Sequence, residues 1–166
     1  MFSFCPRCGS AAFHPFDSGA QRCADCGFVY YLNASAATVA VIFDKNDRLL
    51  VVRRANEPAR GTLDLPGGFV EPNEDVETSL KREVLEETRG EVRIERFLFS
   101  IPNTYEYSGF NVPTADLFFA CQLLSDVPLQ AADDAAEFLW IPRNDLRPAD
   151  FGLTSIRQGI ERLLQL

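Results

Sequence analysis

Histidine is nearly absent from this 166-residue sequence, in which His14 is the only one. A metal centre built from several histidines is therefore excluded, and a Ser-His-Asp triad would depend on this single residue. Long hydrophobic runs are missing as well, because the longest, residues 34–43, is about half of the roughly 20 residues that cross a bilayer. No basic segment followed by an apolar run stands at the N-terminus. We therefore expect a cytoplasmic protein with no membrane partner.

Positive charge is also scarce. Sixteen basic side chains face 24 acidic ones, which gives a formal net charge of -8. Residues 1–33 carry two of each sign, so the whole excess belongs to residues 34–166. An acidic surface repels the phosphate backbone of a nucleic acid, and we therefore expect no nucleic-acid partner. This negative net charge does not exclude the binding of phosphate groups through a metal ion.

Four of the five cysteines lie within the first 26 residues and form two closely spaced pairs: Cys5, Cys8, Cys23 and Cys26. Each pair can supply two thiolates to one tetrahedral zinc ion, and four thiolates leave no position for a reactive water. Two disulfides in a secreted module are the alternative, which the absence of a signal peptide disfavours. The sequence thus predicts a structural zinc ribbon over residues 1–33.

Residues 34–166 are expected to form a second domain of the α/β class. The hydrophobic pattern predicts strands over residues 36–43, 48–53, 91–101, 114–124 and 137–141, with a turn-rich loop over 102–113. One helix is predicted to be capped by Asn73 and to end at Gly90, and another to cover residues 154–164. Strand pairs before and after helices indicate a mixed β-sheet sandwiched between helices.

The first predicted helix is strongly acidic. Residues 71–91 contain eight carboxylates and three basic side chains, which accounts for -5 of the net charge. Glu83, Glu86 and Glu87 are three and four residues apart, so they share one side of the helix and repel one another. A hard divalent cation such as magnesium would relieve this repulsion. The alternative interpretation is a solvated acidic surface.

The residues around this cluster resemble the signature of the Nudix hydrolases. Gly68 and Glu74 are followed by the stretch Arg82-Glu83-Val84-Leu85-Glu86-Glu87, with the family's spacing. One position departs from the pattern, because Arg89 stands where the family usually has glycine and Gly90 follows it. The cysteine-rich segment also resembles the zinc ribbon that precedes some Nudix domains, including NADH pyrophosphatases.

The resemblance implies a role for individual residues. Magnesium or manganese would be bound by Glu83, Glu86 and Glu87 and by the backbone carbonyl of Gly67, while Arg82 would orient the cluster by pairing with Glu74. Nudix enzymes hydrolyse a diphosphate linked to another group, and a glutamate accepts the proton of the attacking water. The candidates for this base are Glu83 and Glu87, followed by three weaker ones: Glu137, Asp133 and Asp134.

Substrate-binding residues must come from outside the signature. NADH pyrophosphatases carry a Ser-Gln-Pro-Trp-Pro-Phe-Pro-type segment that this sequence lacks at residues 100–110, so NADH specificity does not transfer. The candidates are Tyr105, Tyr107 and Phe110 for stacking on a base, with Arg53 and Glu137 as polar contacts. The resemblance implies a pyrophosphohydrolase acting on a small nucleoside diphosphate derivative of the ADP-ribose or dinucleotide type. A noncatalytic nucleotide sensor or protein-binding module is the alternative, and a homodimer is left open.

Overall fold

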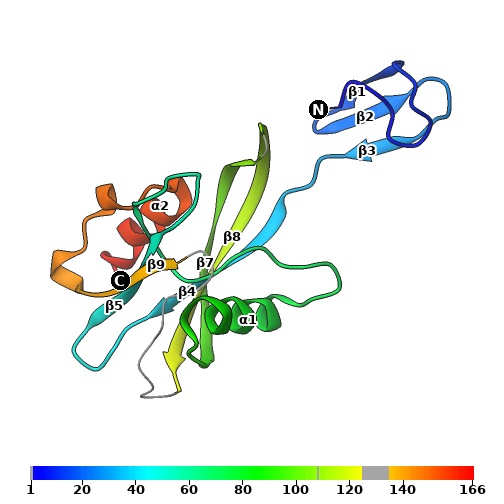
Figure 1. Cartoon of the computed structure of the whole chain (residues 1–166). Helices are drawn as coiled ribbons and strands as arrows, with labels where there is room; N and C mark the ends of the chain where they lie inside the picture. Colours follow the sequence, from blue (N-terminus) through cyan, green and yellow to red (C-terminus); the bar gives the residue numbers. More distant parts are fainter. Residues whose placement is uncertain (1, 108, 125–134) are drawn as a thin grey trace. The chain divides into compact units, whose positions relative to one another are not determined.

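The protein divides into two compact units, Met1–Ala34 and Ser35–Leu166, in a computed structural model that describes residues 2–107, 109–124 and 135–166 (Figure 1). The first unit is a three-stranded antiparallel sheet with the order β1-β2-β3, formed by β1 (Phe13–Asp17), β2 (Ala20–Cys23) and β3 (Val29–Tyr31). Its small hydrophobic core is a cluster of three buried residues, Cys5, Phe13 and Cys23, so two of the three are cysteines.

Two three-stranded sheets build the second unit. β4 (Ser35–Ile42) pairs in parallel with β8 (Phe110–Leu123), which pairs antiparallel with β7 (Val92–Tyr107). β5 (Arg48–Arg54) lies between β6 (Leu63–Asp64) and β9 (Ala135–Pro142) in an antiparallel sheet. The first of these sheets contains both parallel and antiparallel neighbours, as the expected mixed sheet requires.

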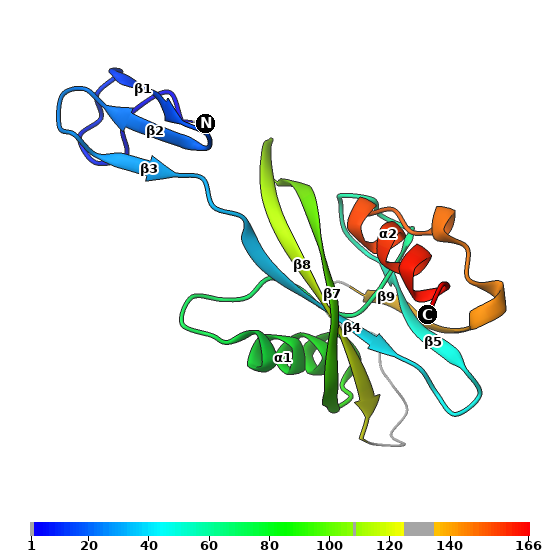
Figure 2. The same ribbon diagram turned by 180° about the vertical axis from the view of Figure 1, so that it is seen from behind.

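The two helices cover different faces of the strands, because neighbouring residues of one strand point to opposite sides. Val39 and Val41 pack with Ile156 and Ile160 of α2 (Thr154–Leu163), whereas Ala40 and the alternate positions pack with α1 (Val76–Thr88) through residues such as Leu80 and Val84. Figure 2 shows the same arrangement of α1 and α2 from behind. The prediction of a mixed sheet between helices is confirmed.

The segment predicted as a loop over residues 102–113 is instead the end of a long β7–β8 hairpin. The two prolines that suggested a loop both lie where the strand has a neighbour on one side only. Pro102 lies on the edge strand β7, and Pro113 precedes the first residue of β8 that pairs with β4, Thr114. Proline is compatible with a sheet at such positions. Tyr105 is thereby placed on a strand.

Both predicted ends of α1 were displaced. Asp75, and not Asn73, caps the helix, because its side chain accepts a hydrogen bond of 2.7 Å from the Thr78 amide. Asn73 adopts a positive φ of 69° in the turn before it. At the other end, Arg89 takes the left-handed conformation with φ 57° and ψ 12°, so the helix ends one residue before the expected Gly90. The remaining short elements are two 3-10 helices, Arg143–Asp145 and Pro148–Asp150.

Within the part of the chain that the structure describes, no helix has the length and apolar character needed to cross a membrane.

Candidate active site

The four cysteine sulfurs of the N-terminal unit lie within 4.8 Å of one another. Cys5 Sγ is 3.7 Å from Cys26 Sγ, and Cys8 Sγ is 3.7 Å from Cys23 Sγ. A tetrahedron with metal–sulfur bonds of about 2.3 Å has edges of about 3.8 Å, whereas a disulfide needs about 2.05 Å. This geometry fits a tetrahedral metal ion and not two disulfides.

In the second unit, α1 directs its glutamates at the turn formed by Gly67 and Gly68. The amide of Gly67 donates a hydrogen bond of 3.1 Å to Glu87 Oε2, and Glu87 is buried. A Cβ atom at Gly68 would lie 2.5 Å from the Glu83 carboxylate, and one at Gly67 would lie 2.0 Å from the Thr38 carbonyl oxygen. Both glycines are therefore required for this close approach of the turn to the helix.

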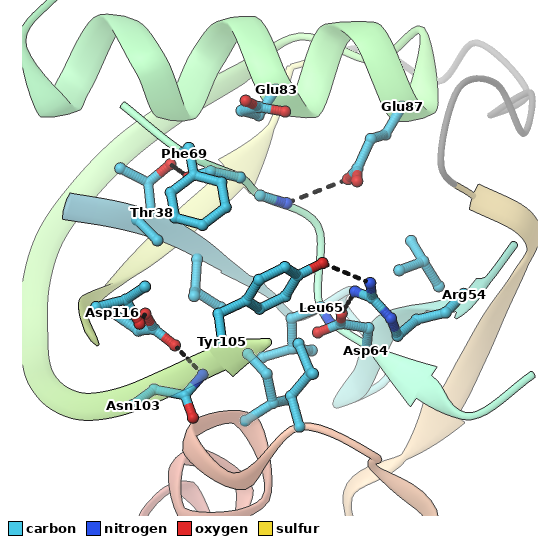
Figure 3. Close-up of a pocket in the computed structure, with 18 of the residues that line it drawn as sticks. Thr38, Arg54, Asp64, Leu65, Phe69, Glu83, Glu87, Asn103, Tyr105 and Asp116 are labelled. Atoms are coloured by element: carbon cyan, nitrogen blue, oxygen red, sulfur yellow. Dashed lines mark hydrogen bonds and ion pairs between the residues drawn. The ribbon is translucent and has the colours of Figure 1, made fainter. Parts of the chain in front are cut away.

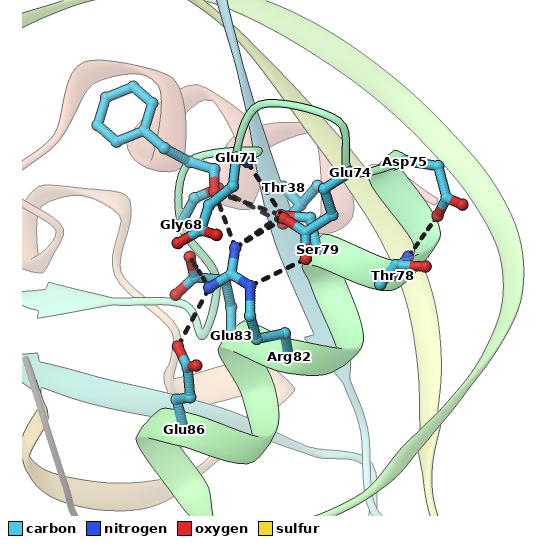
Figure 4. A network of polar contacts seen from close by, with 11 residues as sticks. Thr38, Gly68, Glu71, Glu74, Asp75, Thr78, Ser79, Arg82, Glu83 and Glu86 are labelled. Carbon is cyan, nitrogen blue, oxygen red and sulfur yellow. Dashed lines mark hydrogen bonds and ion pairs between the residues drawn. The ribbon is translucent and has the colours of Figure 1, made fainter.

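Arg82 connects the carboxylates of α1 with the preceding loop (Figure 4). Its Nε and Nη2 atoms each donate to one oxygen of Glu74 at 2.9 Å, while Nη1 donates to Glu83 at 2.9 Å and to Glu86 at 3.1 Å. The hydrogen bonds from Arg82 lower the pKa of Glu74 to about 2. The predicted pairing of Arg82 with Glu74 is present, and the same guanidinium also positions Glu83 and Glu86.

The glutamates line one end of a cavity of about 380 Å³, which is large enough for a nucleoside (Figure 3). Tyr105 lines its middle, where its ring meets Phe69 edge to face at a centroid distance of 5.6 Å. The Tyr105 hydroxyl accepts a hydrogen bond of 3.2 Å from Arg54, which also forms an ion pair of 2.5 Å with Asp64. The structure thus brings Tyr105, a predicted substrate-binding residue, into the same cavity as the glutamates.

The far end of the cavity contains a polar group that the sequence analysis missed. Asp116 is buried and accepts hydrogen bonds from Thr114 at 2.6 Å, from Asn103 at 3.4 Å and from the Ser155 hydroxyl. Burial raises the pKa of the nearby Asp64 carboxyl, the Arg54 guanidinium opposes this rise, and the charge of Asp116 adds to it. The available signal was a lone carboxylate within the apolar stretch 114–124.

Several other candidates lie outside the cavity. Arg53 and Glu137 pair with each other across β5 and β9 at 2.5 Å, and neither lines the cavity. Phe110 is exposed at the start of β8 and does not line it either. The side chain of Tyr107 is not described, and Asp133 and Asp134 lie outside the described residues.

The residues at the glutamate end fit a hard divalent cation. Glu83, Glu86 and Glu87 present carboxylate oxygens, which magnesium and manganese prefer, and Gly68 leaves room beside Glu83 that a side chain would fill. The carboxylates converge less tightly than the four sulfurs, because Glu83 and Glu86 face Arg82 and Glu87 faces the Gly67 amide. Hydrogen bonds from Arg82 and from the Gly67 amide thus hold the three carboxylates beside the Gly67–Gly68 turn.

The chain matches a known class of domain. The family model of the NUDIX domain matches residues 33–163, which is most of the chain. The chain therefore belongs to the NUDIX domain family, and the resemblance of its signature is confirmed.

Known proteins agree with this assignment. The chain is 43% identical over 58 residues to an ADP-ribose pyrophosphatase of Methanocaldococcus jannaschii, a match that covers 35% of this chain and 34% of that protein. It is 33% identical over 97 residues to the NAD-capped RNA hydrolase NudC of Chromobacterium violaceum, covering 58% of this chain and 36% of that protein. The chain thus spans about a third of the length of these curated relatives.

A solved structure shares the fold over nearly the whole chain. The NUDIX hydrolase from Nitrosomonas europaea superimposes with a TM-score of 0.77 and 23% sequence identity, covering 98% of this chain and 90% of that one. At this level of identity the likeness establishes the fold alone. The expected fold class is confirmed by this similarity.

Proposed function

We propose that the protein is a divalent-metal-dependent hydrolase that cleaves the diphosphate bond of a nucleoside diphosphate derivative, of the ADP-ribose or dinucleotide type. The observation that carries the proposal is the position of Glu83, Glu86 and Glu87 against the Gly67–Gly68 turn, at one end of a nucleoside-sized cavity. The names of the two curated relatives support it, because both describe hydrolysis of nucleotide-containing substrates.

The three glutamates, together with the backbone carbonyl of Gly67, would hold magnesium or manganese. A bound divalent ion neutralises phosphate oxygens and lowers the pKa of a coordinated water. Arg82 fixes the orientation of Glu83 and Glu86, so that their carboxylates need no rearrangement when the diphosphate binds. Glu83 or Glu87 accepts the proton of the attacking water.

The remaining parts of the proposal concern the whole chain. Residues 1–33 form a zinc ribbon, with zinc bound by the four clustered cysteines, and residues 34–166 form the hydrolase domain. The formal net charge of -8 favours a small nucleotide over a long nucleic acid, because a polyanion is repelled. The relative named an NAD-capped RNA hydrolase makes a capped oligonucleotide a necessary member of any substrate panel.

The test is a panel of ADP-ribose, dinucleotides, sugar nucleotides, a capped oligonucleotide and phosphate monoesters, incubated with magnesium or manganese in water labelled with heavy oxygen. We expect a nucleoside monophosphate and a second phosphorylated fragment, with the label in one of them. Phosphate release from monoesters alone would contradict the substrate class.

Three variants then assign the activity to the site. Glu83→Gln and Glu87→Gln remove one charge each with little change in volume, and we expect turnover to fall by roughly 10²- to 10⁴-fold. Glu77→Gln is the matched control, because Glu77 is exposed on the same helix and does not line the cavity. Activity that survives in both site variants would contradict the assignment of catalysis to these glutamates. Binding of a nucleotide without cleavage of any compound in the panel would favour the noncatalytic nucleotide sensor.

A further inference from the structure

Asp116 is a buried carboxylate that no cation neutralises directly. It is 6% exposed and lines the end of the cavity opposite the glutamates of α1. Within residues 2–107, 109–124 and 135–166, no lysine, arginine or histidine forms an ion pair with it. A buried charge without a counter-charge is costly, and such groups occur where a ligand supplies the missing interaction.

The contacts of Asp116 leave part of its hydrogen-bonding capacity unused. A carboxylate can accept about four hydrogen bonds. Thr114, Ser155 and Asn103 donate one each, and the bond from Asn103 is long at 3.4 Å. All three donors are neutral, so the carboxyl group still has room for a further donor.

The surroundings of Asp116 suit a flat aromatic ligand. Leu153, which caps α2, and Ile156, which follows the Asp116 partner Ser155 in that helix, also line the cavity. The ring of Tyr105 lines it from β7. Apolar and aromatic side chains of this kind contact the faces of a base, while a polar group reads its edge. The phosphate-binding residues proposed above lie at the opposite end of the same cavity.

We propose that Asp116 determines which base the enzyme accepts, by binding the exocyclic amino group of the substrate's nucleobase. This inference rests on the proposed function, because it assumes that the diphosphate lies at the glutamate end. An exocyclic amino group donates hydrogen bonds. In uridine a carbonyl oxygen replaces the amino group of cytidine and would face the carboxylate with its own lone pairs. In inosine and purine riboside a C–H group replaces the amino group of guanosine and adenosine, so the hydrogen-bond donor is lost. Guanine, adenine and cytosine each carry such a group, and uracil and hypoxanthine carry none.

The test compares nucleoside diphosphate riboses that differ in the amino group. The pairs are guanosine against inosine, adenosine against purine riboside, and cytidine against uridine. The wild-type protein should prefer the amino-bearing member of at least one pair by about 10- to 100-fold in kcat/KM, the range for a hydrogen bond to a charged group. In Asp116→Asn, which keeps the shape but not the charge, this preference should fall by about tenfold.

Ser155→Ala separates recognition from a structural role. Ser155 belongs to α2, so its hydrogen bond to Asp116 also joins that helix to β8. If Asp116 only holds α2 in place, both variants will lose stability while the preference among the bases stays unchanged. Under the proposal, Ser155→Ala keeps the preference because the carboxylate is still present. Should Asp116→Asn fail to fold, Asn103→Ala takes its place, and a change in the preference is again expected.

Binding of the matching nucleoside monophosphates to the full-length protein, measured by calorimetry, distinguishes the two proposals. An amino-dependent affinity without cleavage of any diphosphate would support the role of Asp116 and refute the proposed reaction. Cleavage of diphosphates without an amino preference in any pair would support the reaction and overturn the role of Asp116.

Discussion

Arg89 is the one residue that departs from the family signature, and its backbone conformation gives a quantitative prediction. With φ 57° and ψ 12° it is left-handed, a conformation that costs a residue with a Cβ atom about 1–2 kcal/mol and costs glycine nothing. Its side chain is exposed and forms no hydrogen bond or ion pair with the described residues. The strain therefore lies in the backbone alone.

We compare Arg89→Gly with Arg89→Ala, because both remove the positive charge from the C-terminal end of α1. Glycine relieves the left-handed strain, about 1–2 kcal/mol, but its greater freedom in the unfolded chain offsets about 0.5–1 kcal/mol. The glycine variant should therefore be more stable than the alanine variant by roughly 0.5–1 kcal/mol.

Urea unfolding followed by Trp140 fluorescence measures this difference, since Trp140 is the only tryptophan and lies on β9. With a slope of about 1–3 kcal/mol per molar urea, the midpoint of the glycine variant should be higher by roughly 0.2–1 M at an unchanged slope. An alanine variant as stable as the glycine variant would refute the argument from backbone strain.

Three further predictions concern the metal, the pH dependence and the helix cap. The purified protein should contain about one zinc per chain by elemental analysis, and acid or a chelator should release it; two disulfides by mass spectrometry would contradict this. The pKa of Glu74 is depressed to about 2, so its pairing with Arg82 stabilises the fold above pH 4.5 and is lost as the pH falls toward 2. The destabilisation caused by Glu74→Gln should accordingly shrink below pH 4.5 in urea titrations, and a difference that stays constant with pH would exclude the linkage. Asp75→Ala should cost about 1 kcal/mol in the same assay, whereas Asn73→Gly, which keeps a positive φ accessible, should cost much less; equal losses would argue against the cap.

The features predicted from the sequence are those that depend on residues close together in the chain. The cysteine pairs and the apolar positions of α1 are local patterns, and both are found in the structure. The cap at Asp75 was missed because Asn73 and Asp75 are both good capping residues, and only the backbone conformation of Asn73 excludes it. The end of the helix was predicted at Gly90 because glycine adopts the left-handed conformation of a helix terminus without strain, yet Arg89 adopts this conformation.

The long hairpin and the far end of the cavity depend on contacts that no local pattern reveals. Pro102 indicates a loop unless the strand is known to lie at a sheet edge, which is a property of the whole topology. Asp116 and Ser155 are 39 positions apart in the sequence, and only their contact in the folded chain shows that Asp116 is a candidate site residue. Its position in an apolar stretch was visible, but the cavity beside it was not.

The cavity therefore has two ends with different origins, and this separation has a mechanistic consequence. The glutamate end comes from residues 67–87, which are held together by Arg82 and by the Gly67 amide. The opposite end comes from β7, β8 and α2, whose packing does not involve those bonds. Under the proposed function, substitutions at the first end should lower turnover for every substrate, because all substrates would share the diphosphate. Substitutions at the second end should change the ranking of substrates while the metal requirement stays the same. On these two proposals, one domain keeps a single reaction while contacts distant in the sequence determine the base on which it acts.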